Sequence, residues 1–163
     1  MKPLVHLAWA MILLLASGCP ASFDFPLGAP DAKPIDKRLL GSWTTERNST
    51  IVNSFTITSA SPTTYDIIVK DRTEWYKLTT DHLIAWVTQV GKLKFICLKP
   101  ENENQYYHYT YSFDQGILVG AEFSLKYEES FSSTQKLRDY VKSNLKNNEV
   151  ILLGGDERWR KQD

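Results

Sequence analysis

The chain has 163 residues, of which 42% are hydrophobic and 23% charged, and its 19 Lys and Arg residues balance 19 Asp and Glu residues. Because no basic run accompanies this balance, the composition argues against a nucleic-acid-binding protein and gives no reason to expect an acidic substrate. The length beyond the N-terminal segment suits one domain with a sizeable core.

The first nineteen residues, MKPLVHLAWAMILLLASGC, predict an export signal. Lys2 supplies a small positive start, and the apolar run Leu4–Leu15 is too short to span a bilayer, which takes roughly 20 apolar residues. The small residues Ala16–Gly18 then precede Cys19. An ordinary secretory signal that happens to end near a cysteine is the alternative interpretation.

This order of residues resembles the lipobox of bacterial lipoproteins, with Ala16 where that family usually has Leu. The resemblance implies cleavage after Gly18, a diacylglyceryl group on the thiol of Cys19, and acylation of the new N-terminus. Two or three acyl chains hold a domain at a membrane almost permanently, since each buried CH2 contributes roughly 0.8 kcal/mol. In Gram-negative lipoproteins an Asp after the cysteine usually marks retention in the inner membrane, so Pro20 implies the outer membrane.

Residues 20–34, PASFDFPLGAPDAKP, contain four prolines among small residues. Prolines fix φ and remove amide donors, so this stretch predicts an extended and irregular tether that lifts the domain off the lipid surface. The expected organisation is therefore a signal over 1–18, a lipidated cysteine and tether over 19–34, and one domain over 35–163.

Short runs rich in β-branched and aromatic residues predict about eight strands in the domain. They are Leu40–Thr45, Ile51–Thr58, Thr64–Lys70, Thr73–Thr79, His82–Gln89, Lys92–Lys99, Gln105–Phe113 and Ile117–Ser124. Their short connections require antiparallel neighbours, because a parallel crossover needs a dozen or more residues. Since open sheet edges invite mispairing, we predict a mainly β fold, an antiparallel up-and-down barrel that closes on itself.

One C-terminal helix follows the strands. Ser133 offers an N-cap hydroxyl, and Leu137, Val141 and Leu145 form a narrow apolar stripe on an otherwise charged segment. The narrow stripe favours packing on the barrel over binding to a membrane. Glu149–Leu153 predicts a short final strand.

The tripeptide Gly41, Ser42 and Trp43 stands at the start of the first predicted strand. Together with the order of strands, helix and last strand, it resembles the lipocalin, or calycin, arrangement. The resemblance implies that the Trp43 side chain closes the bottom of the barrel and packs under a basic side chain. The arginine that usually precedes the helix in this family has no clear match, and Lys126 is the nearest basic residue.

Aromatic side chains along the predicted strands are candidates for lining a ligand pocket. On Gln105–Phe113 the tyrosines at odd positions share one face with Phe113, and the other face is mixed polar, which is typical of a wall between an interior and solvent. Such rings could equally be packed core. The candidate lining residues are Trp75, Trp86, Tyr107, Tyr109 and Tyr111.

The remaining reactive side chains give no catalytic pattern. Cys97 lies in phase with its apolar neighbours and predicts a small buried hydrophobe, with a Cys19–Cys97 disulfide as the competing interpretation. His82 and His108 lack the spacing of a metal site, and no nucleophile elbow, P-loop or nucleotide fingerprint occurs. We therefore expect a protein that is not an enzyme and needs no metal or cofactor.

These features predict a lipid-anchored envelope protein whose closed barrel binds a small apolar ligand. The alternative is a barrel filled by its own side chains that works through its outer surface, in one variant as an inhibitor of an envelope enzyme. Its natural contact points would be the loops Pro100–Asn104 and Glu128–Ser133. The membrane, reached through Cys19, is the expected partner, and the sequence identifies no protein partner.

Overall fold

The computed structural model describes residues 21–30, 32–47, 50–72, 80–125, 130–145 and 150–162. The predicted signal, the lipidation site Cys19 and the predicted strand Thr73–Thr79 with Trp75 lie outside these residues.

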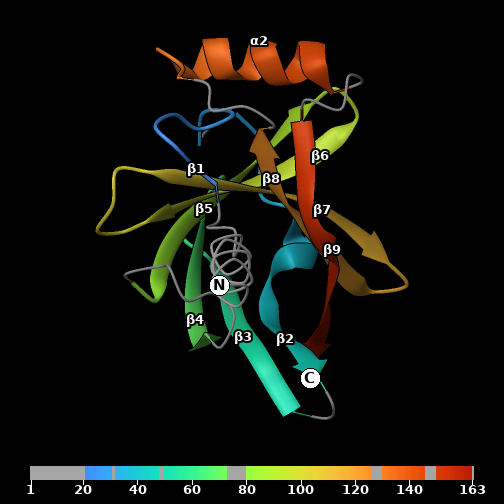
Figure 1. Cartoon of the computed structure of the whole chain (residues 1–163). Helices are drawn as coiled ribbons and strands as arrows, with labels where there is room; N and C mark the ends of the chain where they lie inside the picture. Colours follow the sequence, from blue (N-terminus) through green and yellow to red (C-terminus); the bar gives the residue numbers. More distant parts are fainter. Residues whose placement is uncertain are drawn as a thin grey trace, which may run out of the picture.

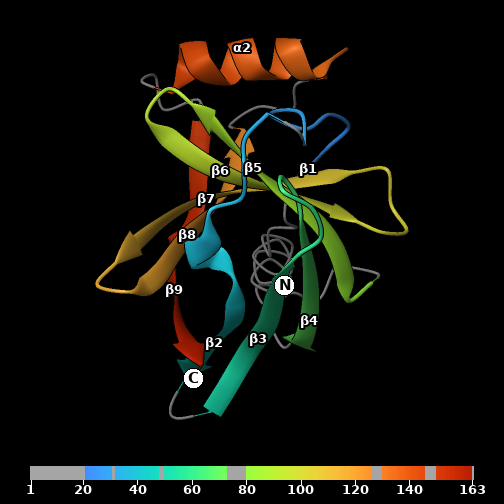
Figure 2. The same cartoon turned by 180° about the vertical axis from the view of Figure 1, so that it is seen from behind.

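Eight strands form a closed antiparallel barrel, which confirms the predicted fold class and is consistent with a lipocalin-like barrel (Figures 1 and 2). Each strand pairs with the next along the chain, and β9 closes the ring by pairing with both β8 and β2. The strands are β2 (Gly41–Arg47), β3 (Thr50–Ser59), β4 (Tyr65–Arg72), β5 (His82–Val90), β6 (Leu93–Pro100), β7 (Tyr106–Asp114), β8 (Ile117–Leu125) and β9 (Val150–Gln162).

The closing strand β9 is much longer than the predicted Glu149–Leu153. It has 13 residues and runs from the end of the barrel nearest helix α2 (Thr134–Asn144) to the opposite end (Figure 1). Within Glu157–Gln162 only Trp159 is buried, so the period-two hydrophobic signal of a strand is almost absent there. Hydrogen bonding to both neighbours, which a local pattern cannot show, sets the length of this strand.

Strands β4 and β5 are direct neighbours in the sheet, with Tyr65 opposite Ala85 and Ile68 opposite His82. A strand over Thr73–Thr79, which lies outside the described residues, was expected between them. The barrel therefore reaches eight strands by including β9, and not by a strand between β4 and β5.

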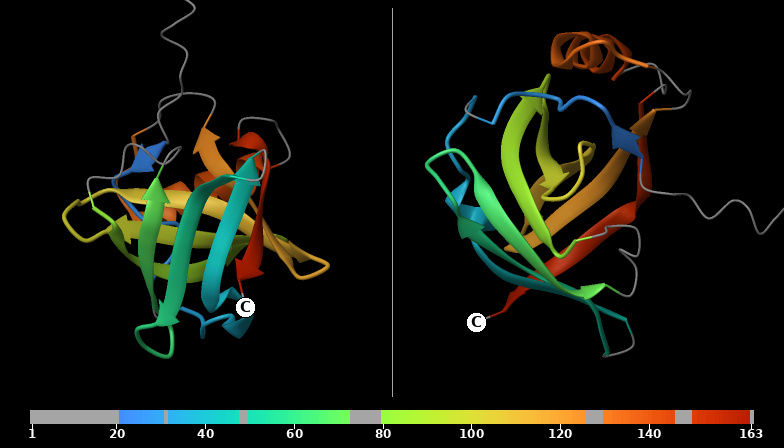
Figure 3. Two further views of the ribbon diagram at one scale, coloured as in Figure 1. Left: turned by 90° about the horizontal axis from the view of Figure 1, so that it is seen from below. Right: turned by 90° about the vertical axis from the view of Figure 1, so that its left-hand side faces the viewer.

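Residues 21–30 lie against the barrel wall and do not form the expected free tether. Strand β1 (Ser22–Phe23) pairs antiparallel with β7 outside the closed ring, and the segment runs between helix α2 (Thr134–Asn144) and the barrel (Figure 3). Phe23 and Leu27 are buried. Burial of these apolar side chains stabilises the packing, the polar Asp24 between them stays exposed, and Pro26 keeps the chain extended.

The wall of the barrel separates two hydrophobic cores because successive side chains on a strand point to opposite faces. On β6, Ile96 and Leu98 point into the barrel, and Phe95 and Cys97 point outward. The inner core comprises Leu39, Trp43, Phe55, Ile57, Tyr65, Ile67, Val69, Leu83, Ala85, Val87, Ile96, Leu98, Tyr107, Tyr111, Leu118 and Trp159. The outer core comprises Phe23, Leu27, Trp86, Val90, Phe95, Cys97, Phe123, Leu137 and Val141.

Helix α2 covers the outer core with the predicted stripe. Leu137 and Val141 are fully buried, and the hydroxyl of Ser133 accepts a hydrogen bond from the Lys136 amide at 3.2 Å as an N-cap. Among the described residues, no helix has the length and apolar character needed to cross a bilayer.

Candidate functional site

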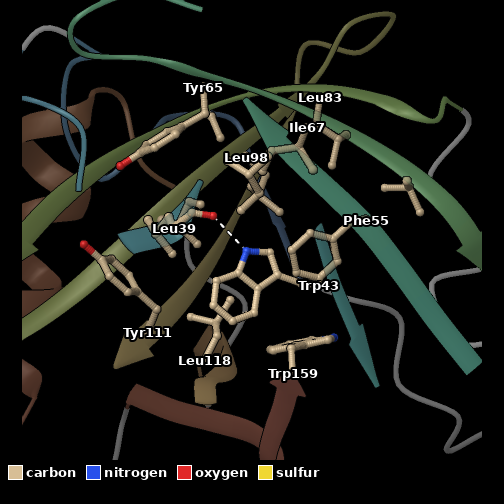
Figure 4. Close-up of a cluster of buried hydrophobic side chains, with 14 of the residues drawn as sticks. Leu39, Trp43, Phe55, Tyr65, Ile67, Leu83, Leu98, Tyr111, Leu118 and Trp159 are labelled. Carbon is tan, nitrogen blue, oxygen red and sulfur yellow. Dashed lines mark hydrogen bonds between the residues drawn. The ribbon is translucent and has the colours of Figure 1, made fainter. Parts of the chain in front are cut away.

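Trp43 fills one end of the barrel interior from β2. Its side chain is 1% exposed, and its indole Nε1 donates a hydrogen bond to the Leu39 carbonyl at 2.8 Å (Figure 4). Leu39 belongs to the short 3-10 helix η1 (Lys37–Leu39), so this bond ties the turn before the barrel to its first strand. The ring of Phe113 lies 6.1 Å from that of Trp43.

A basic side chain covers Trp43, and it comes from β9. The Nζ of Lys161 lies 5.7 Å from the centroid of the Trp43 ring. Gly41 makes this approach feasible: a Cβ there would lie 2.5 Å from Lys161 Cε, and its φ of +126° is a conformation that other residues rarely adopt. Lys161 was not predicted as this basic residue, because the last strand is longer than the predicted Glu149–Leu153. Ser42 points to the other face and shares a 3.0 Å hydrogen bond with Thr56.

The structure brings together three of the five candidate lining residues. Tyr107 and Tyr111 belong to the inner core, and Tyr109 packs against it. Trp86 lies instead on the outer wall, where its Nε1 donates to the Gly28 carbonyl at 2.7 Å. The other candidate, Trp75, lies outside the described residues.

One cavity inside the barrel, lined by described residues, is small. A cavity of about 50 Å³ remains within the inner core, with walls that are almost wholly apolar. Ligand pockets usually measure roughly 300–1,000 Å³, so this cavity is several times too small for an organic ligand. It is lined by Leu39, Phe55, Ile57, Ile67, Ile96, Leu98, Tyr109, Thr110, Tyr111, Leu118, Gly120 and Trp159.

A larger depression of about 340 Å³ opens where two hairpins diverge. The β6–β7 pairing ends at Phe95 and Thr110, whereas the β5–β6 and β7–β8 hairpins continue beyond that point. The two hairpin ends point to the same side of the barrel in Figures 1 and 2. We call this depression the cationic cleft. It is lined by Arg38, Lys92, Leu93, Lys94, Thr110, Tyr111, Ser112, Phe113, Val119 and Gly120.

All three charged residues that line the cationic cleft are basic, and one is held in place. The Nε of Arg38 donates to Asp36 at 2.8 Å, and its guanidinium carbon lies 4.6 Å from the centre of the Phe113 ring. The hydrogen bonds from Arg38 hold the pKa of the Asp36 carboxyl below its usual value. Lys92 and Lys94 are exposed. Sequence reasoning missed this set because Arg38 is far from both lysines along the chain.

The two histidines lie in different environments. His82 is partly exposed, and its Nδ1 lies 3.1 Å from Glu101, which raises the His82 pKa. His108 is fully buried on the outer wall, where its Nε2 contacts the Phe25 carbonyl at 3.3 Å, and burial lowers its pKa to about 4. Within the described residues, no group of three or more His, Cys, Asp and Glu side chains could hold a metal ion.

Cys97 is fully buried in the outer core, and burial raises the pKa of its thiol to about 12. A thiol in this environment stays protonated and unreactive, so its role there is packing.

Comparisons of this chain with protein-family models, with curated proteins and with solved structures return no match.

Proposed function

We propose that this protein is a lipid-anchored component of a bacterial cell envelope that acts through the outer surface of a filled barrel, without catalytic chemistry. The observation that supports the filled barrel is the interior cavity of about 50 Å³. Of the described residues, sixteen are buried in the inner core. Trp43, Phe55 and Trp159 are among them, and Figure 4 shows how these three lie together. A barrel of this size holds either side chains or one small ligand, and the small cavity supports the first of these.

The lipid anchor is proposed because the residues before Cys19 resemble a lipobox. The outer membrane is proposed because Pro20 follows the cysteine, where an Asp would usually mark retention in the inner membrane. Acyl labelling of cells that express the chain tests this directly. Cys19→Ala should abolish the label and release the protein into the soluble fraction. Cys97→Ala is the matched control, because Cys97 is the other cysteine of the chain and should leave the label intact. A Cys19→Ala protein that stays in the membrane fraction would overturn the anchor.

A second candidate function is the binding of a small apolar ligand inside the barrel. The apolar wall of the cavity, with Tyr109 and Tyr111 among its lining, favours it. Ligand entry would then require side chains of the inner core to move apart, so that the cavity grows severalfold from about 50 Å³.

Native mass spectrometry of the whole chain, extracted in a mild detergent, separates the two candidates. A filled barrel gives the mass of the acylated chain alone in repeated preparations. A reproducible extra mass that organic extraction removes, without loss of the covalent acyl groups, would instead establish the ligand-binding function. That result would identify the ligand class at the same time.

A further inference from the structure

We propose that the cationic cleft binds a phosphate-bearing ligand between the β5–β6 and β7–β8 hairpins. The inference rests on the cleft itself and does not depend on the anchor or on the state of the barrel interior.

The shape of the cleft suits such a ligand. Residues 93–94 of β6 and 111–113 of β7 continue past the last β6–β7 pair, so these facing strand edges have no partner across the cleft. Backbone groups on a strand point alternately to its two edges, so some amide groups of both segments point into the opening. An amide that points into the opening is a donor for an anion or for water. The volume of about 340 Å³ accommodates a phosphate and part of the group that carries it.

Arg38 presents its guanidinium to the cleft in a restrained position. Its Nε and Nη2 are bonded to the Asp36 carboxylate, and its guanidinium stacks on Phe113. These contacts restrain the guanidinium plane of the exposed Arg38 before any ligand binds, and its Nη1 donors are not used by Asp36. A restrained guanidinium loses less entropy on binding than a free one and presents a planar fork to phosphate oxygens.

The charge of the cleft favours an anion. Lys92 and Lys94 form no ion pair within 4.0 Å with any carboxylate of the described residues, although Lys94 contributes to the low pKa of Asp36. Since the Arg38–Asp36 pair is neutral overall, the two lysines give the cleft a net positive charge. A phosphate group, with close to two negative charges and three acceptor oxygens, satisfies these donors better than a carboxylate.

The probe for the test is inorganic pyrophosphate, added to the whole chain in a detergent with an uncharged headgroup and followed through backbone amide NMR signals. We expect saturable shifts at Leu93, Lys94, Ser112 and Phe113, with an affinity that falls as salt is added. In a second arm, an anionic phospholipid is added to the same micelles without pyrophosphate. Shifts in the first arm indicate a soluble phosphate ligand, and shifts in the second arm alone indicate a lipid headgroup.

The double variant Lys92→Ala with Lys94→Ala should weaken the saturable binding by about tenfold or more, because it removes two charged donors. The matched control is Lys136→Ala with Lys142→Ala, which removes the same charge from exposed positions on α2 and should leave the affinity unchanged. Equal losses in both double variants would show general charge attraction and overturn the proposed site. The absence of saturable shifts in both arms would overturn it as well.

Discussion

Lys161 on the last strand lies over the ring of Trp43 on the first barrel strand, with its Nζ 5.7 Å from the ring centroid. The contact joins the two strands at which the barrel closes, since Trp43 and Lys161 are also cross-strand partners in the β2–β9 pairing. A cation over an indole ring contributes about 0.5–1 kcal/mol at exposed sites. Closure at this end therefore combines backbone pairing with a side-chain contact.

Gly41→Ala should destabilise the fold by about 1–3 kcal/mol from backbone strain alone, because φ at this position is +126°. The added Cβ would also meet Lys161 Cε, so part of the cost should disappear when Lys161→Ala is present. Urea unfolding of the two single variants and the double variant measures both parts. An equal cost of Gly41→Ala in the two backgrounds would contradict the contact with Lys161.

Trp43→Phe should cost about 1–3 kcal/mol or more, because the buried Leu39 carbonyl loses its indole donor and the smaller ring leaves a void. Trp86→Phe is a matched variant, since it removes an indole bond to the Gly28 carbonyl on the outer wall. Hydrogen exchange should increase around η1 in the first variant and around residues 27–28 in the second. Faster exchange at η1 in both variants would contradict this separation of the cores.

Arg138 joins three parts of the outer layer, and Arg138→Ala should loosen them together. Its Nη1 donates to the Leu27 carbonyl at 2.9 Å and to the Thr88 hydroxyl at 3.1 Å, and its Nη2 donates to the Gln89 carbonyl. Since bonds from a charged donor contribute about 1.5–3 kcal/mol, we expect a loss of about 2–4 kcal/mol.

Hydrogen exchange of residues 23–28 and of α2 measures this loosening, and the exposed Lys142→Ala is the control. Arg138→Lys should recover only part of the stability, because a lysine cannot reproduce the planar fork. Full recovery of the lost stability in Arg138→Lys would show that a positive charge at this position is sufficient to hold the outer layer together.

The buried His108 predicts a loss of stability in mild acid. Its pKa is about 4 in the folded state against 6.5 for the unperturbed group, so the folded state favours the neutral ring. The stabilisation of the folded state by the neutral His108 ring is complete above pH 6.5. As the pH falls towards 4, the free energy of unfolding decreases by about 3 kcal/mol in total. His108→Phe should flatten the stability profile over this window.

Chemical denaturation at a series of pH values tests this profile. His82→Ala is the control, because contact with Glu101 raises the His82 pKa and its small, exposed contribution has the opposite sign. A profile of His108→Phe as steep as that of the unmodified chain would assign the acid sensitivity to other groups.

The barrel was predictable where burial alternates along a strand. On β7, the ring-bearing face of Tyr107, Tyr109 and Tyr111 points inward as the sequence indicates. The opposite face of β7 was expected to meet solvent, yet His108 there is fully buried. Phe23 and Phe25 cover it from 83 or more positions earlier in the chain, and no local pattern encodes such a contact.

The candidate site was less predictable than the barrel. The interior residues could be recognised as aromatic, but the volume they leave depends on how Phe55, Leu118 and Trp159 interdigitate. The cationic cleft results from the point at which β6 and β7 stop pairing, and strand register is a property of the folded sheet. Arg38 joins this cleft only because η1 lies beside Phe113.

The backbone amide of Ala21 donates a 2.7 Å hydrogen bond to the Glu122 carboxylate, and β1 begins at the next residue. Pro20 is the single residue between Ala21 and Cys19. An acylated Cys19 would therefore have its Cα within about 8 Å of a fixed point on the barrel wall. Such a protein would have no long flexible linker between its lipid anchor and the barrel. The bilayer would therefore hold the barrel in a restricted orientation, with the same side always facing the lipid.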